Sequence, residues 1–251
     1  MAASPEVAEV AAAAAAGRLR CSARQEPGMD CGVQWPQDHG ADVNQQSYQY
    51  RPQRAAGIPN VILALLISNG LAFAAQQMTP YMFLLALWPM GAGDSPVPFM
   101  PWQLLTYGFL HGSLMHLAFN MFALWMFGRE LEVMMGSKRF LTYYLVCVVG
   151  AGCIQLLVAA VQGGPAYPTV GASGGVFGIL LAYGMTFPNR MVMLVFPPIP
   201  MRAKYFVILI GVFELYVGFS GRSPGIANFA HIGGMLFGFV LLKFWGWPRR
   251  R

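Results

Sequence analysis

Long apolar runs, separated by short polar segments, fill the chain after about residue 58. The stretch 140–189 contains no Asp, Glu, Lys or Arg. A helix needs about 20 apolar residues to cross a bilayer, and the runs have this length or are slightly shorter. The pattern therefore predicts a bundle of six transmembrane helices, near 59–77, 111–127, 140–161, 173–187, 203–219 and 226–244.

The connection between the first two predicted helices, about 78–110, has a different character. It is rich in aromatic residues and methionine, it carries one charged residue, Asp94, and prolines interrupt it at 89, 96, 98 and 101. It is too apolar for an aqueous loop and too broken to span. We expect an interfacial segment that lies in the headgroup region.

Composition and charge support an all-α, polytopic membrane protein. Of the 251 residues, 56% are hydrophobic and 10% are charged, whereas soluble domains carry about 25% charged residues. The net charge of +6 does not indicate nucleic acid as a partner, because the basic residues lie between apolar runs rather than on one patch. With the N-terminus inside, 15 of the 16 Lys and Arg fall on the cytoplasmic side, and Arg222 alone falls outside. Both termini are therefore predicted to be cytoplasmic.

The predicted domains follow from the same contrast. Residues 1–55 hold few large apolar side chains and are expected to form a disordered cytoplasmic tail. This start lacks the early positive charge of a secretory signal peptide. Residues 56–247 form the predicted membrane domain, and 248–251 a basic cytoplasmic C-terminus. The cysteines show no CxxC or Cys/His metal spacing, so we expect no structural disulfide, zinc site or cofactor.

Polar side chains inside the predicted spans are the functional candidates, because burying them in a bilayer is costly. The second and sixth helices run from outside to inside, and the fourth follows an outer loop, so most of these residues can share one depth. The set comprises His111, His116, Asn120, Ser173, Glu214, Asn228 and His231.

Glycine spacing indicates which helices meet. The pairs Gly174-xxx-Gly178 and Gly234-xxx-Gly238 are close-packing motifs for membrane helices, so the fourth and sixth helices should approach closely. Ser173 precedes the first motif, and we expect it to come within hydrogen-bond range of His231. A serine in this setting can also be mere helix-packing glue, and a lone interfacial histidine can be structural.

Five sequence pieces together resemble one family. In chain order they are Trp102-Gln103, HGSLMHLAFN at 111–120, Glu132 before Gly136, GASG at 171–174, and AHIGGMLFG at 230–238. The chain is similar over about 58–245 to rhomboid intramembrane serine proteases of the bacterial six-helix type. The arginine that often follows the tryptophan is Gln103 here, a departure that concerns the anchoring of the first outer loop.

The resemblance implies a role for each matching residue. Ser173 would be the nucleophile and His231 its general base. His116 and Asn120, with the Ser173 N–H, would form the oxyanion hole, supported by three further residues of the site: Gly171 of the nucleophile motif, Phe177 stacking on the histidine, and His111.

The chemistry of these residue types is consistent with those roles. A serine hydroxyl needs an adjacent base to become nucleophilic, and with no Asp nearby we predict a dyad, with Phe177 as the group that orients His231. For Glu214 the favoured interpretation is that its side chain reaches the outer interface, and the alternative is a hydrogen bond within the outer half of the bundle. Glu132 and Arg129 are expected to pair at the cytoplasmic end.

The predicted function is hydrolysis of peptide bonds in or near transmembrane segments of single-span or polytopic membrane proteins, in the bilayer of a bacterial inner membrane. A second hypothesis is a non-proteolytic rhomboid-like protein that binds membrane clients, although such proteins usually lack the serine or the histidine. A transporter is the third, but it normally shows an internal repeat or more intramembrane charge.

Overall fold

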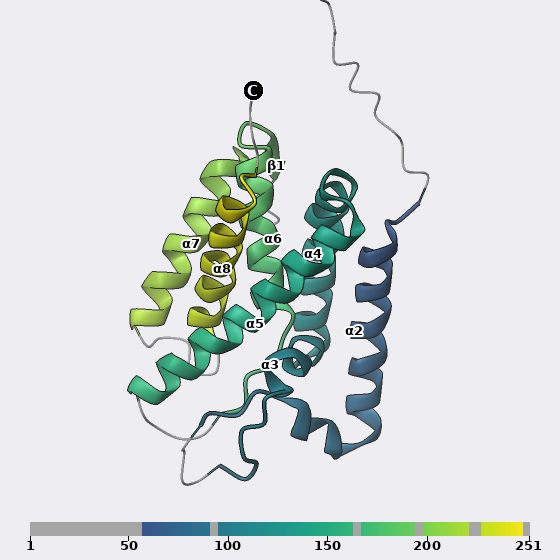
Figure 1. The fold of residues 1–251 in the computed structure, drawn as a ribbon, viewed down its shortest axis with the longest axis vertical. Coiled ribbons are helices and arrows are strands. Elements are labelled where there is room, and N and C mark those ends of the chain that lie inside the picture. The colour runs from purple at the N-terminus through teal and green to yellow at the C-terminus, as the bar shows by residue number, and fades with distance from the viewer. Residues whose placement is uncertain (1–56, 91–94, 163–166, 194–197, 221–226, 248–251) are drawn as a thin grey trace, which may run out of the picture. The chain divides into compact units, whose positions relative to one another are not determined.

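A computed structural model describes residues 57–90, 95–162, 167–193, 198–220 and 227–247, all within one compact unit, 54–251. Two predicted segments lie outside the described residues: the tail 1–55 and the C-terminus 248–251. The elements, in chain order (Figure 1), are α2 Asn60–Met78, η1 Pro80–Leu85, α3 Gln103–Thr106, η2 Tyr107–Phe109, α4 Leu114–Met135, α5 Ser137–Gln162, α6 Ser173–Thr186, β1 Met191–Met193, β2 Pro200–Arg202, α7 Ala203–Ser220 and α8 Asn228–Phe244.

Each predicted long helix corresponds to one long helix of the described structure. The main difference is α4, which begins three residues later than expected. Ser113 caps it by accepting a hydrogen bond from the His116 N–H at 3.1 Å. The helix then continues to Met135, beyond the expected residue 127. Gly136 caps its C-terminal end with a φ of 79°, a conformation that suits glycine.

By length and composition, three of the described helices can cross a membrane: α2, α5 and α7. α6 and α8 are apolar but shorter, with 14 and 17 residues. The chain is thus mostly helical with three clear candidate spans, and crossing by all six helices stays a prediction.

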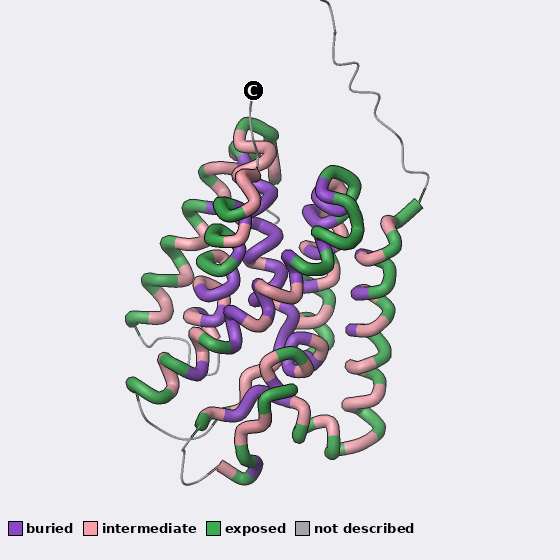
Figure 2. The backbone as a smooth tube through the Cα atoms, viewed as in Figure 1, coloured by how far each residue is buried: buried purple, intermediate pink, exposed green. Residues whose placement is uncertain are grey.

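The core forms where α5, α6 and α8 pack together through glycines. A Cβ atom on Gly234 would lie 1.9 Å from the carbonyl oxygen of Gly174, so α8 and α6 touch backbone to backbone. A Cβ on Gly178 would lie 2.4 Å from Cys147 Sγ of α5. The expected approach of the fourth and sixth helices is therefore observed, with α5 as a third member. Buried residues accordingly follow the length of α6 (Figure 2).

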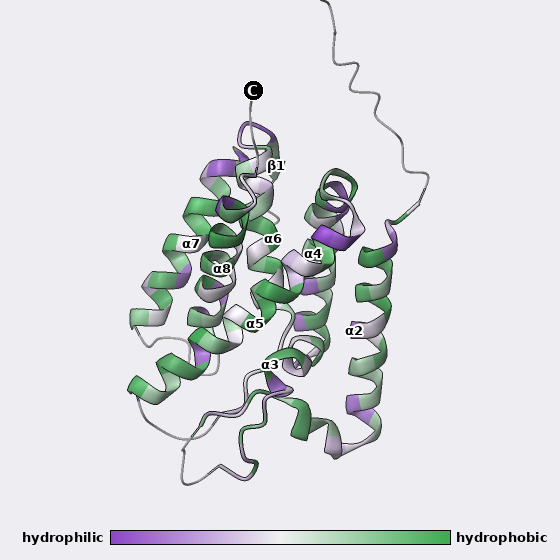
Figure 3. Cartoon of the chain, in the orientation of Figure 1, coloured by the Kyte–Doolittle hydropathy of each residue, from purple (hydrophilic) through white to green (hydrophobic). Residues whose placement is uncertain are grey.

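The outer helices carry apolar side chains on their exposed faces, as a lipid environment favours. In α7, Phe213 is 59% exposed and Val212 58% exposed. Figures 2 and 3 show that α2 and α7 are exposed over much of their surface and yet largely hydrophobic. These two helices fit contact with acyl chains better than contact with water.

The described parts of the segment 78–110, residues 78–90 and 95–110, pack onto the bundle and have a small core around Trp88 and Leu110. Gln103 is fully buried and organises it. Its Oε1 accepts from the backbone N–H groups of Trp88 and Met100, and its Nε2 donates to the carbonyls of Leu84 and Pro98. The residue that departs from the family pattern therefore anchors this segment through backbone hydrogen bonds. Whether the segment lies in the headgroup region stays a prediction.

At the opposite end of the bundle, the expected pairing of Glu132 with Arg129 is wrong. The Glu132 carboxylate accepts from the N–H groups of Val61 and Ile62, at 3.0 and 2.9 Å, and from the Ser137 hydroxyl at 2.7 Å. It thereby supplies partners to the first N–H groups of α2, which have none within their own helix. Arg129 instead lies over the Trp125 ring.

A short antiparallel hairpin, β1 paired with β2, joins α6 to α7 and was not predicted. Next to it, Arg190 forms an ion pair with Glu130 of α4. The end of α6 therefore lies beside the end of α4, far from Ser173 at the start of α6.

Candidate active site

Ser173 and His231 meet where α6 and α8 begin. Ser173 is the first residue of α6, and His231 is the fourth residue of α8. The Ser173 Oγ lies 2.8 Å from the His231 Nε2. The contact joins residues 58 positions apart in the chain, and the backbone contact between Gly174 and Gly234 makes it possible. A hydroxyl hydrogen-bonded to an imidazole nitrogen is the arrangement in which the imidazole can take the proton.

Phe177 stacks on His231, one turn after Ser173. The ring centroids are 4.2 Å apart and the planes differ by 6°. This contact is the stacking expected from the sequence, and it restricts the tilt of the imidazole. It leaves the ring free to turn in its own plane, so it does not determine which nitrogen faces Ser173.

Gly171 shapes the approach to Ser173. Its φ of 133° is a conformation that L side chains rarely adopt. A Cβ atom there would lie 2.9 Å from the Nε2 of His116 and 3.5 Å from the Ser173 Oγ. The Gly171 N–H donates to the Tyr107 carbonyl at 3.0 Å. The glycine therefore provides the space in which His116 comes close to Ser173.

His116 and Asn120 lie one turn apart on α4. Asn120 is buried, and its amide nitrogen donates one hydrogen bond to the His116 carbonyl at 2.9 Å. The second N–H of this amide remains for another acceptor. His116 is beside Ser173, as the Gly171 geometry indicates. Their role toward an oxyanion stays a prediction.

His111 precedes α4 and supports His116 from behind. It is 2% exposed, and its ring meets the His116 ring edge-on with centroids 5.1 Å apart. Its backbone exchanges two hydrogen bonds with the Gln76 amide of α2. His111 thus joins α2 to the start of α4 and packs behind His116.

Glu214 overturns the favoured interpretation from sequence. Its carboxylate does not extend away from the bundle, because the Oε2 lies 2.9 Å from the His231 Nδ1 and 2.6 Å from the Asn228 Nδ2. We predicted a dyad, with Phe177 rather than an acid as the group that orients His231. An acid is present, and it is a glutamate on another helix, α7.

A sequence signal for Glu214 existed. Gly211 and Gly218 lie three residues before it and four after it, and positions three and four apart share a helix face. Gly218 packs against α8, where its Cβ would lie 3.2 Å from the Phe229 ring. A face that carries small residues is the face that meets a neighbouring helix, so Glu214 falls on the inner side of α7.

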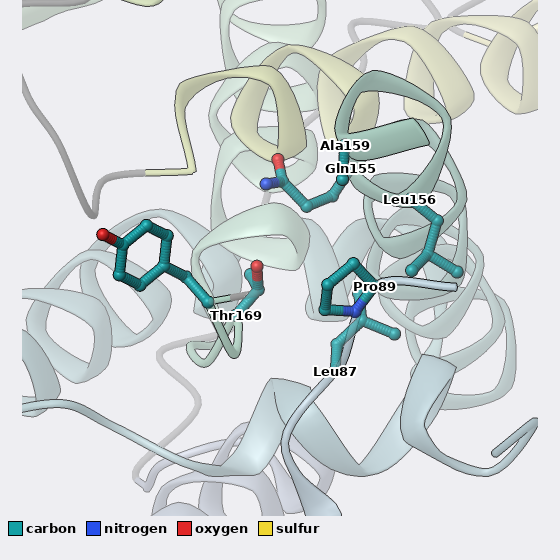
Figure 4. A pocket seen from close by; sticks show the side chains of 7 residues that line it. Leu87, Pro89, Gln155, Leu156, Ala159 and Thr169 are labelled. Carbon is teal, nitrogen blue, oxygen red and sulfur yellow. The ribbon is translucent and has the colours of Figure 1, made fainter. Parts of the chain in front are cut away.

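Other candidate sites in the described ranges are few. No group of three His, Cys, Asp or Glu side chains that could hold a metal ion occurs among the described residues. Cys147 and Cys153 are free thiols. A small pocket lies between α5 and the segment before α6, where Gln155 and Thr169 face the same space (Figure 4). None of its lining residues belongs to the predicted site.

Comparisons with known proteins show the family of the chain. A model of the rhomboid domain matches residues 98–247. The chain is 30% identical over 217 residues to rhomboid protease GlpG of Serratia proteamaculans, covering 82% of this chain and 69% of that protein. It is 37% identical over 150 residues to rhomboid protease GluP of Bacillus subtilis, covering 59% of this chain and 27% of GluP.

A third relative is the mitochondrial rhomboid protein 1 of Saccharomyces cerevisiae, 29% identical over 150 residues, which are 58% of this chain and 41% of the yeast protein. The matched part of the chain thus spans less than half the length of the Bacillus and yeast relatives.

Proposed function

Since this chain belongs to the rhomboid family, we propose that it is an intramembrane serine endopeptidase that hydrolyses peptide bonds in or near transmembrane segments of other membrane proteins. Ser173 attacks the scissile carbonyl, and His231 takes the serine proton. The observation that carries the proposal is the 2.8 Å contact between Ser173 Oγ and His231 Nε2, made across two helices inside an apolar bundle.

The reaction proceeds in two halves. His231 Nε2 accepts the Ser173 proton as Oγ bonds to the substrate carbonyl carbon, and the resulting imidazolium then protonates the leaving amine. Water enters next, and its oxygen bonds to the acyl carbon as His231 takes a proton from it. The imidazolium then returns this proton to Ser173 Oγ as the bond to Oγ breaks, and the acyl group leaves as a carboxylic acid. Hydrolysis therefore requires water at Ser173. Both Ser173 and His231 are partly exposed, which is consistent with that need.

The oxyanion is bound by groups from two helices. Ser173 is the first residue of α6, and the first N–H groups of a helix have no carbonyl partner within it. We assign its N–H, a His116 ring nitrogen and the second Asn120 N–H as donors. Each well-placed donor contributes roughly 3 to 4 kcal/mol to the transition state. Gly171 permits this by leaving room for His116 beside Ser173.

The proposed substrates are single-span or polytopic membrane proteins. A peptide bond inside a transmembrane helix is shielded by its own backbone hydrogen bonds, so the substrate must become extended at the cut. Gly or Pro near the bond lowers that cost. No metal or organic cofactor takes part in these steps, since the base, the nucleophile and the donors are all side-chain or backbone groups.

The test is cleavage by purified protein in liposomes. A panel of single-span substrates is incubated with wild type, Ser173→Ala and His231→Ala, and products are identified by mass spectrometry. We expect cleavage within or beside the substrate's span, reduced roughly 10³-fold or more in either variant. Gly70→Ala serves as the matched control, because its added methyl group meets nothing within 4 Å.

A client-binding protein without protease activity is the competing function. It would retain substrate in a pull-down but release no fragment, and Ser173→Ala would bind as wild type does. Equal cleavage by wild type and Ser173→Ala would overturn the proposed chemistry. Loss of cleavage on chelation of divalent metals would also contradict it.

We further propose that the protein resides in a bacterial inner membrane with both termini in the cytoplasm. The distribution of Lys and Arg supports this orientation. Reporter fusions at each terminus, active only on one side of the membrane, test it. Two cytoplasmic signals are expected, and one periplasmic signal would contradict an even number of spans.

A further inference from the structure

We propose that Glu214 is a positioning residue for catalysis, whose carboxylate holds His231 in the tautomer and orientation that let Nε2 accept the Ser173 proton. The inference rests on the function proposed above for Ser173 and His231. It replaces the dyad expected from sequence with an ordered line of three side chains from three helices, α6, α8 and α7.

The geometry of this line is complete. Ser173 Oγ lies 2.8 Å from one ring nitrogen of His231, and the Glu214 Oε2 lies 2.9 Å from the other. Both distances lie in the normal hydrogen-bond range. The side chains of His231 and Glu214 are 13% and 12% exposed, so water competes little for the hydrogen bond between them.

The chemistry requires an acceptor where Glu214 lies. A neutral imidazole carries one N–H, and its other nitrogen is the acceptor. If Nε2 is to take the Ser173 proton, the hydrogen must be on Nδ1. The Glu214 carboxylate accepts that hydrogen and thereby selects the productive tautomer. It also faces the positive charge that His231 acquires when it takes the proton.

Asn228 holds the carboxylate in place. Its Nδ2 donates to the same Oε2 at 2.6 Å. Asn228 precedes His231 by three residues, so both donors project from one face of α8 toward α7. Glu214 is therefore fixed by a group that does not titrate, and Phe177 stacks on the His231 ring. Together the stacking and the carboxylate restrict both the tilt and the in-plane rotation of the ring.

Placing the acid on α7 makes the orientation of His231 depend on the position of that helix. The buried residues of α7 are Ala203 and Val207, which lie 11 and 7 positions before Glu214 (214 − 203 and 214 − 207). In the half of α7 near Glu214 no described residue is buried, and the hydrogen bonds between Glu214 and α8 help to hold this half in place. A shift of this half away from α8 would remove the acceptor from Nδ1.

A purely structural tie between α7 and α8 is the competing explanation, and a small probe separates the two. A fluorophosphonate reacts with Ser173 directly, so its rate depends on His231 as a base and not on the entry of a transmembrane substrate. We would measure second-order labelling rates for wild type, Glu214→Gln, Glu214→Ala and Glu214→Asp. Asn228→Ala is the matched control, because it removes a hydrogen bond between α7 and α8 while the carboxylate remains on Nδ1.

The expected order follows from what each variant retains. Glu214→Gln is isosteric and keeps an acceptor without charge, so labelling slows roughly 10-fold, whereas Glu214→Ala slows it roughly 100-fold. Glu214→Asp recovers part of the loss in Glu214→Ala. Asn228→Ala slows labelling less than Glu214→Ala does. With a transmembrane substrate, kcat falls in Glu214→Gln while KM stays near the wild-type value.

The outcomes separate this inference from the proposed function. If Ser173→Ala is labelled as fast as wild type, the proposed function fails. If labelling depends on Ser173 but Glu214→Gln and Glu214→Ala keep the wild-type rate, the positioning role is overturned while the function stands. If Asn228→Ala slows labelling as much as Glu214→Ala, the structural tie is the correct explanation. Unfolding of Glu214→Ala leaves the isosteric Glu214→Gln as the deciding variant.

Discussion

Two glutamates turn into the bundle from opposite ends, and their partners differ. Glu132 is 2% exposed and accepts from two backbone N–H groups of α2 and one hydroxyl. Glu214 accepts from an amide and from the imidazole of His231. The groups that donate to Glu132 keep their protons throughout the proposed hydrolysis, whereas the imidazole of His231 gains and loses a proton during it.

This contrast shows that the role of a carboxylate inside a membrane bundle depends on the groups that donate hydrogen bonds to it. Glu132 joins α4 to the start of α2, so replacing it should lower the free energy of unfolding. Glu214 joins α7 to the imidazole that transfers protons, so replacing it should lower the rate of reaction at Ser173. Three predictions test this division, beginning with the largest expected change in stability.

Replacing Glu132 by Ala should reduce stability severely and leave the chemistry of the folded fraction intact. Two backbone N–H groups of α2 would lose their partner, at roughly 1 to 3 kcal/mol each, so the free energy of unfolding should fall by roughly 2 to 6 kcal/mol. Unfolding in mixed detergent micelles measures this. Glu130→Ala is the control on the same turn, because Glu130 is partly exposed and pairs with Arg190.

This division between a folding role and a catalytic role would be contradicted by one result. In that result, folded Glu132→Ala protein reacts with a fluorophosphonate as slowly as Glu214→Ala does. In that case the two ends of the bundle would be coupled, and the distinction between a folding carboxylate and a catalytic positioning carboxylate would not hold.

Adding a methyl group at Gly234 should affect folding and chemistry together. The new Cβ would lie 1.9 Å from the Gly174 carbonyl oxygen, so α8 must move away from α6 and carry His231 away from Ser173. We expect Gly234→Ala to lose roughly 1 to 3 kcal/mol of stability and also labelling rate. Gly70→Ala, with open space around the added methyl group, should change neither. A stable and fully active Gly234→Ala would show that the contact is not tight.

The smallest effect is expected at the ion pair between Arg190 and Glu130. Their side chains are 41% and 30% exposed, and such pairs contribute below about 1 kcal/mol. The hydrogen bond from Arg190 to Tyr183, with the nearby Glu130, raises the pKa of Arg190, so Arg190 keeps its charge at all working pH values. Arg190→Ala should lower stability slightly, less at high salt. A loss as large as that of Glu132→Ala would overturn the ranking of the two sites.

Much of the site could be predicted from local patterns. The glycine pairs of α6 and α8 predicted their contact, and the placement of Ser173 before one pair and His231 before the other predicted that they meet. The helix contact could be predicted because small residues mark helix interfaces directly, whatever surrounds the helix. The stacking of Phe177 on His231 was instead implied by the family resemblance.

The orientation of α7 and the partners of Glu132 were harder to predict. Hydrophobic periodicity tells which side of a helix is buried only when the other side faces water, and α7 is apolar nearly all round. The rotation that turns Glu214 inward was thus hidden from that pattern. Glu132 meets residues about 70 positions away in sequence, and Gln103 satisfies four backbone groups in an irregular segment. Such contacts depend on tertiary structure.

The central claim, that Ser173 is activated by His231, is tested most directly by locating a covalent adduct. Wild type is treated with a fluorophosphonate in liposomes, digested, and sequenced by mass spectrometry. We predict one adduct on the peptide that contains Ser173, absent in Ser173→Ala and strongly reduced in His231→Ala. An adduct on another residue, or substrate cleavage that continues at full rate once Ser173 is modified, would contradict the account.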